Sequence, residues 1–98
     1  MPQLELAPEV LDDFDRFFNH IARYDPQSAP ERIGAIVQAL QVLTHSPLIG
    51  RPARGGLREL VIGHGTRGYV ALYRFVPPLD TAFVLAIRHQ SEAGFSHP

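Results

Sequence analysis

The chain changes its periodicity once, from apolar residues at helical spacing to runs rich in β-branched and aromatic residues, and this order limits the folds open to it. In the first half, two sets of apolar residues at helical spacing predict two amphipathic helices, joined by about five residues into a helical hairpin. The sets are Val10, Phe14, Phe17, Phe18 and Ile21, then Ile33, Ile36, Val37, Leu40 and Leu43.

Strand signals lie on both sides of this hairpin. The stretch PLIGRPARGG at residues 47–56 is rich in Pro and Gly and predicts a loop. We therefore expect an α+β fold, with the hairpin packed on one face of a mainly antiparallel sheet of about four strands. The length of 98 residues fits a single domain over residues 1–98. The predicted strands are residues 3–6, 58–62, 69–76 and 81–87.

Three local signals refine the helices. Pro8 suits the first turn of a helix. The spacing of Ser28 and Glu31 matches a capping box, in which the two side chains bind the free N–H groups at a helix start. Gly34 lies inside the second predicted helix, where glycine costs up to about 1 kcal/mol relative to alanine. We therefore expect another element to pack closely against Gly34.

The charges are nearly balanced in total but not along the chain. Nine basic and ten acidic residues give a net charge of −1, which excludes a uniformly basic nucleic-acid coat. Residues 1–50 carry seven acids and three arginines, whereas residues 51–98 carry six arginines and three acids. The predicted hairpin is therefore acidic and the sheet half basic, which leaves room for one cationic face.

Two residue types are missing, and each absence excludes a kind of chemistry. Without cysteine there is no disulfide, no thiolate metal site and no thiol nucleophile. Without lysine there is no Schiff-base amine, and every positive side chain is an arginine, which can hold phosphate or carboxylate bidentately. The histidines show no metal-ligand spacing, and we expect no metal site.

The glycines of Gly63-His-Gly65-Thr-Arg-Gly68 match a dinucleotide fingerprint, but a strand-like run follows them where the fingerprint requires a helix. We read them as a hairpin loop with Arg67 at its tip, and we expect no cofactor. The start of the chain has no signal-peptide pattern, and no apolar run is long enough for a membrane span. We expect a cytoplasmic protein that does not contact a membrane.

The most promising polar residues lie on the predicted strands. Arg58, Arg74 and Arg88 fall on three successive strands, where Arg88 has the parity of Val84 and Ala86. If all three project from the uncovered face, they form a cationic surface suited to phosphate or a carboxylate-bearing partner; alternatively they mark strand edges and extend to solvent. His89 adjoins Arg88, and a neighbouring guanidinium favours the neutral imidazole that a general base needs. A surface histidine bonded to backbone fits the sequence equally well.

The order of elements and four motifs resemble the RelE/ParE family of bacterial toxins from type II toxin–antitoxin modules, also described as plasmid stabilisation proteins. The resemblance implies a growth inhibitor encoded beside a small antitoxin that wraps it and forms a hetero-oligomer with it. The motifs are Pro47-Leu-Ile-Gly-Arg-Pro52, Arg58-Glu-Leu-Val61, Tyr69-Val-Ala-Leu-Tyr-Arg74 and Ala86-Ile-Arg-His-Gln90.

The family has two mechanistic branches. RelE-like members cleave messenger RNA on the ribosome, and that resemblance would make Arg58, Arg67, Arg88 and His89 the candidate catalytic residues. The chain departs from that branch, because loose alignment puts Ser91 and Phe95 where a basic residue and a tyrosine would stand.

ParE-like members bind and poison DNA gyrase without chemistry of their own. Gly50-Arg-Pro52 and Arg58-Glu-Leu-Val61 resemble this branch more, and we favour it; a non-toxic protein that only binds its antitoxin is a third reading. In every case an acidic antitoxin, or the target, should meet the arginines of the sheet half. These are Arg51, Arg54, Arg58, Arg67, Arg74 and Arg88.

Overall fold

The computed structural model describes residues 1–96, and within them the elements follow the expected order. Two helices follow the first strand, and the second ends in a 3₁₀ turn over Gln41–Thr44. The helices and strands are β1 (Gln3–Leu6), α1 (Pro8–Tyr24), α2 (Ala29–Leu40), β2 (Arg51–Pro52), β3 (Arg58–Ile62), β4 (Tyr69–Val76) and β5 (Thr81–His89).

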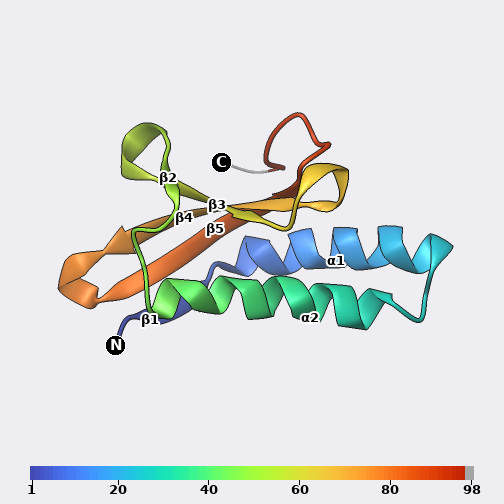
Figure 1. Cartoon of the computed structure of the whole chain (residues 1–98), viewed down its shortest axis with the longest axis horizontal. Helices are drawn as coiled ribbons and strands as arrows, with labels where there is room; N and C mark the ends of the chain where they lie inside the picture. Colours follow the sequence, from blue (N-terminus) through green and yellow to red (C-terminus); the bar gives the residue numbers. More distant parts are fainter. Residues whose placement is uncertain (97–98) are drawn as a thin grey trace.

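The strands form one five-stranded sheet in the order β1-β5-β4-β3-β2. β1 pairs parallel with β5, and the other pairs are antiparallel. The two helices lie side by side on one face, so the α+β architecture is confirmed (Figure 1). The fifth strand, β2, lies in the stretch predicted as loop, because Arg51 and Pro52 pair with Glu59 and Arg58. Two residues are too few to produce a strand pattern in the sequence.

The core fills the space between the helices and the covered face of the sheet. Side chains of β4 and β5 alternate, so every second residue of β4 points toward the helices. The buried cluster comprises Val10, Phe14, Phe17, Ile36, Leu40, Leu43, Tyr69, Ala71, Tyr73, Ala82, Val84 and Ile87.

No helix among residues 1–96 is both long and apolar enough to cross a membrane.

A β-bulge in β5 changes which of its residues face the helices. Leu72 pairs with Ala86 and Tyr73 with Val84, so Leu85 is the extra residue. Beyond the bulge Ile87 continues the covered face, and Arg88, which pairs with Val70, lies on the opposite face. The expected shared parity of Arg88 and Val84 is therefore wrong.

Two local predictions about α2 are also wrong. The Ser28 hydroxyl caps no helix N–H; it donates instead to the carbonyl of Asp25 (3.2 Å), and α2 begins at Ala29. Gly34 is exposed, and a Cβ built on it would meet no atom within 4 Å. Apolar periodicity locates a helix but does not report what packs on its polar side.

A buried carboxylate ties α1 to β5. Asp13 has no exposed surface, and its Oδ2 accepts the backbone N–H of Ile87 at 2.9 Å. Its Oδ1 accepts a hydrogen bond from Arg16 Nη1 at 2.8 Å. A helix residue thus satisfies a buried donor of the sheet directly.

Candidate functional site

The face of the sheet away from the helices is lined by mixed apolar and charged side chains. Residues paired across neighbouring strands project from the same face. Glu59 pairs with Arg51 and with Leu72, and Arg74 pairs with Phe83, so these side chains share that face. Figure 1 shows the C-terminal segment on this side of the sheet, opposite the helices.

A groove of about 700 Å³ crosses this face, between the segment after β2 and the C-terminal segment. Glu59 and Leu72 line it from the sheet, and Phe95 lines it from the C-terminal segment. We call it the open-face groove. Its lining residues are Ala53, Arg54, Leu57, Glu59, Leu72, Phe95 and Ser96.

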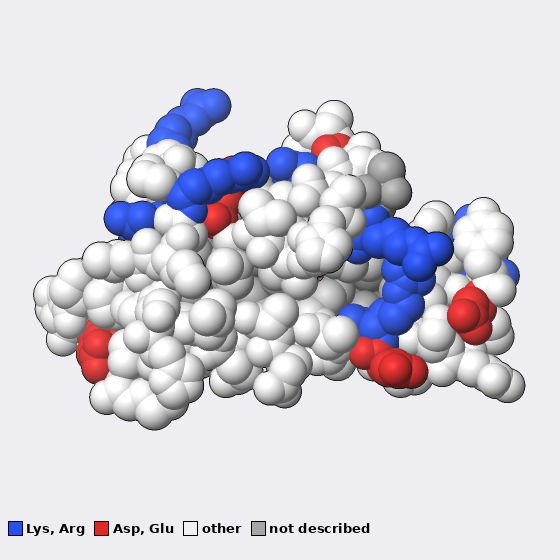
Figure 2. Space-filling view, in the orientation of Figure 1, with Lys and Arg blue, Asp and Glu red and all other residues white. Residues whose placement is uncertain are grey.

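Three arginines lie around this groove, and they differ in the contacts that hold their side chains. Arg51 Nε donates to Glu59 Oε1 at 3.1 Å, an exposed pair that water screens. Arg74 Nη2 donates to the carbonyl of Gly55 at 2.7 Å, and Arg54 lines the groove itself. Figure 2 shows basic side chains gathered over the β2–β3 end and, separately, below the β3–β4 turn.

Arg88 lies on the same face but is committed to the C-terminal turn. Its Nη1 lies 3.3 Å from the carbonyl oxygen of Glu92 and 3.5 Å from those of His89 and Gln90. Its guanidinium also stacks over the Phe95 ring, 5.3 Å from the centroid. Arg88 therefore positions the wall of the open-face groove.

Arg58 lies on the other face, because it pairs with Tyr73, a core residue. Its Nη1 donates to the carbonyls of Leu48 (3.1 Å) and Gly50 (2.8 Å). The expectation that Arg58, Arg74 and Arg88 could converge on one face is therefore wrong for Arg58. The face from which a strand residue projects depends on how its strand pairs with the next one, and the sequence does not give that pairing register.

Arg67 lies in the turn between β3 and β4, as the glycine pattern predicts. It lines a small pocket of about 180 Å³ together with Arg32 and Ile36 of α2 and with Tyr69. The turn is a 3₁₀ segment, Gly65–Arg67, closing an antiparallel hairpin. Arg67 is thus apart from the open-face groove, whose lining does not include it.

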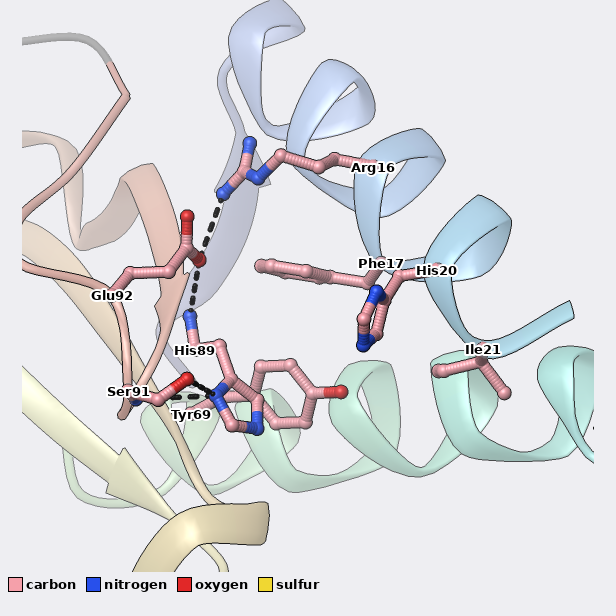
Figure 3. A pocket seen from close by; sticks show the side chains of 8 residues that line it. All are labelled: Arg16, Phe17, His20, Ile21, Tyr69, His89, Ser91 and Glu92. Atoms are coloured by element: carbon pink, nitrogen blue, oxygen red, sulfur yellow. Dashed lines mark hydrogen bonds and ion pairs between the residues drawn. The ribbon is translucent and has the colours of Figure 1, made fainter. Parts of the chain in front are cut away.

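His89 lines a third pocket, of about 260 Å³, between α1 and the C-terminal turn (Figure 3). Its Nδ1 accepts the backbone N–H of Ser91 at 3.1 Å and lies 2.6 Å from Ser91 Oγ. A ring that accepts at Nδ1 carries its proton on Nε2 when neutral. The contact with the backbone of Ser91 therefore occupies the Nδ1 lone pair of His89.

An ion pair closes one side of the same pocket. Glu92 Oε1 accepts the backbone N–H of His89 (2.7 Å) and a bond from Arg16 Nη2 (3.2 Å), as Figure 3 shows. Burial lowers the pKa of Arg16, but its hydrogen bonds and charge interactions with Asp13 and Glu92 raise it above the ordinary value. Burial raises the pKa of the Tyr69 hydroxyl, and the positive charge of Arg32 on α2 offsets part of this rise.

The four candidate catalytic residues are thus not brought together. Arg58 holds a loop on the covered face, Arg67 lies in a turn, and Arg88 and His89 are bonded within the C-terminal turn. Neighbouring positions 88 and 89 face opposite sides of the sheet, since they pair with Val70 and Tyr69. No group of three His, Asp or Glu side chains within residues 1–96 could hold a metal ion.

Sequence reasoning missed three residues that shape these surfaces. Phe95 was weighed only for its lack of a hydroxyl, yet it forms a groove wall. The sequence places Tyr73 in the predicted strand 69–76 but gives no sign that its hydroxyl binds the 47–50 loop. Asp13 lies three residues after Val10 and four before Phe17, so it falls on the apolar stripe of α1, and this spacing is the signal that it is buried.

Comparisons with known proteins agree with this geometry. The family model of the ParE toxin of the type II toxin–antitoxin system, parDE, matches residues 4–94. Toxin RelE3 of Caulobacter vibrioides is 29% identical over 92 residues, covering 94% of this chain and 98% of that protein.

Two solved structures share the fold. The chromosomal ParDE system of P. aeruginosa superposes with a TM-score of 0.77 at 22% identity, covering 91% of this chain and 96% of that one. The intact E. coli RelBE toxin–antitoxin complex superposes with a TM-score of 0.61 at 16% identity, covering 94% and 100%. The chain belongs to the ParE toxin family of type II toxin–antitoxin systems, within the RelE/ParE superfamily.

Proposed function

We propose that this toxin arrests growth by binding DNA gyrase, without catalysing a reaction, and that an antitoxin encoded beside it neutralises it. The observation that carries the proposal is the dispersal of its cationic and imidazole groups. RNA cleavage needs a base for the 2′-hydroxyl, a cation near the phosphorane and an acid for the leaving oxygen, all around one phosphate. Binding needs none of these.

The contacts of the individual residues support this choice. Arg58 and Arg88 project from opposite faces of the sheet and donate to backbone carbonyls of their own chain. The Nδ1 atom of His89 accepts a backbone N–H, so it is not available to take a proton from RNA. Phe95 offers no hydroxyl as an acid.

The antitoxin has a suitable surface in the open-face groove. Leu72 and Phe95 provide apolar contacts, while Arg54 and the neighbouring Arg74 contribute positive charge beside the single carboxylate of Glu59. An extended segment that alternates acidic and apolar residues would complement this surface. Both solved relatives come from toxin–antitoxin systems, which supports a cognate antitoxin as partner.

Inducible expression in a bacterial host tests the proposal, with growth, the DNA damage response and messenger RNA integrity followed together. We expect growth arrest with DNA breaks, and inhibition of supercoiling by purified gyrase. The variant His89→Gln should remain as toxic as wild type. Arrest with ribosome-dependent RNA cleavage that His89→Gln abolishes would favour the RelE-like alternative, for which the match to Toxin RelE3 is the supporting observation.

A third outcome concerns a chain that has lost toxicity. If expression leaves growth unchanged while the product of the adjoining short reading frame binds tightly, the protein is an antitoxin-binding module and the gyrase proposal is wrong. If that product does not bind, the antitoxin part of the proposal is wrong. The cytoplasm is the compartment in which we expect both partners to act.

A further inference from the structure

The loop of residues 47–50, between the 3₁₀ turn after α2 and strand β2, is held by two side chains of the sheet. The Tyr73 hydroxyl donates to the carbonyl of Pro47 and accepts the N–H of Gly50, both at 2.8 Å. Arg58 Nη1 donates to the carbonyls of Leu48 and Gly50. Four hydrogen bonds therefore fix the backbone of a four-residue loop.

Close packing restricts the loop further. A Cβ on Gly50 would lie 2.6 Å from Tyr73 Cε1 and 2.9 Å from the carbonyl oxygen of Glu59. Only glycine lets the backbone approach the buried tyrosine this closely. Tyr73 has no exposed surface, so it anchors the loop from within the core.

The same loop displays two large apolar side chains to solvent. Leu48 is 58% exposed and Ile49 is 56% exposed, although they are adjacent and the loop does not need them for its hydrogen bonds. Because the loop backbone is already ordered, these two side chains would lose little conformational entropy on inserting into a partner protein.

The charges around the loop indicate the kind of partner. Between residues 46 and 62 the charged side chains are Arg51, Arg54, Arg58 and Glu59, an excess of two positive charges. The two apolar anchors would therefore fit an apolar socket surrounded by acidic groups. Such a socket must be preformed, since Leu48 and Ile49 project outward and offer no groove to a flexible segment.

We propose that Leu48 and Ile49 insert into an acid-rimmed apolar socket on the folded target protein, and that the antitoxin occupies the open-face groove without needing them. This inference rests on the proposed function, under which the target is DNA gyrase. It makes Arg58 and Tyr73 positioning residues, which act by holding the loop that carries the anchors.

The double variant Leu48→Ala/Ile49→Ala tests the inference against Leu11→Ala. Leu11 is a matched control, because it is 59% exposed on α1, away from the loop. We expect the double variant to need at least about tenfold more protein to inhibit supercoiling by purified gyrase, and to lose growth arrest, since interface anchors dominate affinity. Its affinity for the antitoxin should stay within threefold of wild type.

Two further variants separate a direct contact from loop position. Leu48→Met/Ile49→Val keeps apolar anchors and should inhibit gyrase like wild type. Tyr73→Phe keeps the core ring but releases Pro47 and Gly50, and should weaken gyrase inhibition while antitoxin affinity is retained. Thermal melting of each variant establishes that it is folded at the assay temperature.

The outcomes are distinct. If wild type arrests growth and inhibits gyrase, but the double variant inhibits gyrase as well as Leu11→Ala does, the inference is wrong while the proposed function stands. Equal loss of antitoxin and gyrase binding by the double variant also overturns it. If wild type neither arrests growth nor inhibits gyrase, the proposed function is wrong and the inference falls with it.

Discussion

The buried carboxylate of Asp13 should contribute a large part of the stability of this fold. Replacing it by alanine leaves the N–H of Ile87 without its partner in a site that water does not reach. An unsatisfied buried donor costs about 1–3 kcal/mol, and bonds to charged groups lie at the upper end. Arg16 is 35% exposed at its side chain and keeps Glu92, so little charge is stranded.

We therefore expect Asp13→Ala to lower the free energy of unfolding by about 2–4 kcal/mol, out of a total of about 5–15 kcal/mol for a domain of this size. Urea unfolding followed by circular dichroism measures it, and the midpoint of thermal unfolding should fall by roughly 10–25 °C. Asp13→Asn keeps an oxygen that can accept the Ile87 N–H, so its loss should be about half as large.

Asp12→Ala is the matched control, because Asp12 is exposed on the same turn of α1. Its effect should stay within about 0.5 kcal/mol. An Asp13→Ala variant as stable as the control would refute the reasoning. So would an Asp13→Asn variant as unstable as the alanine variant, since the charge and not the hydrogen bond to the sheet would then be the stabilising part.

Three other predictions concern single positions, each measured by urea unfolding. Gly34→Ala should stabilise the protein by about 0.5–1 kcal/mol, because the site is exposed and helical; a loss would mean that α2 packs differently there. Gly50→Ala should destabilise by about 1–3 kcal/mol through overlap with Tyr73, and an unchanged midpoint would contradict that contact. Stability should fall as pH rises above about 10, because Tyr69 ionises in the unfolded chain before it does in the native one; Tyr69→Phe should lose less over the same range, and identical profiles would contradict the burial effect.

The fold class followed from periodicity because periodicity reports which face of an element is buried. Helices α1 and α2 and the strands after them were predicted within a few residues for that reason. β2 was missed because a two-residue strand has no period, and its pairing depends on where the β3 backbone lies. The predicted capping box does not form, because the Ser28 hydroxyl donates to the carbonyl of Asp25 in a local turn instead.

The site was less predictable, because it depends on register. Arg58 was grouped with Arg74 and Arg88 because the three fall on successive strands, but its pairing with Tyr73 turns Arg58 toward the helices. The stabilised 47–50 loop requires Tyr73 to reach 26 positions back to Pro47, a contact with no local signal. The division of charge along the chain located the basic half of the protein, because counting charged residues does not require the pairing register of the strands.

The bulge at Leu85 makes the length of β5 as important as its composition. If β5 paired with β4 without the bulge, Leu85 would lie opposite Leu72 and every later residue would change sides, so Ile87 would face the open-face groove and Arg88 the helices. The one extra residue therefore keeps an apolar side chain in the core and keeps the groove-wall support of Arg88 on the open face. Deleting Leu85 would join Val84 to Ala86 in the pairing that the structure already has, so it should remove the bulge and leave both faces unchanged.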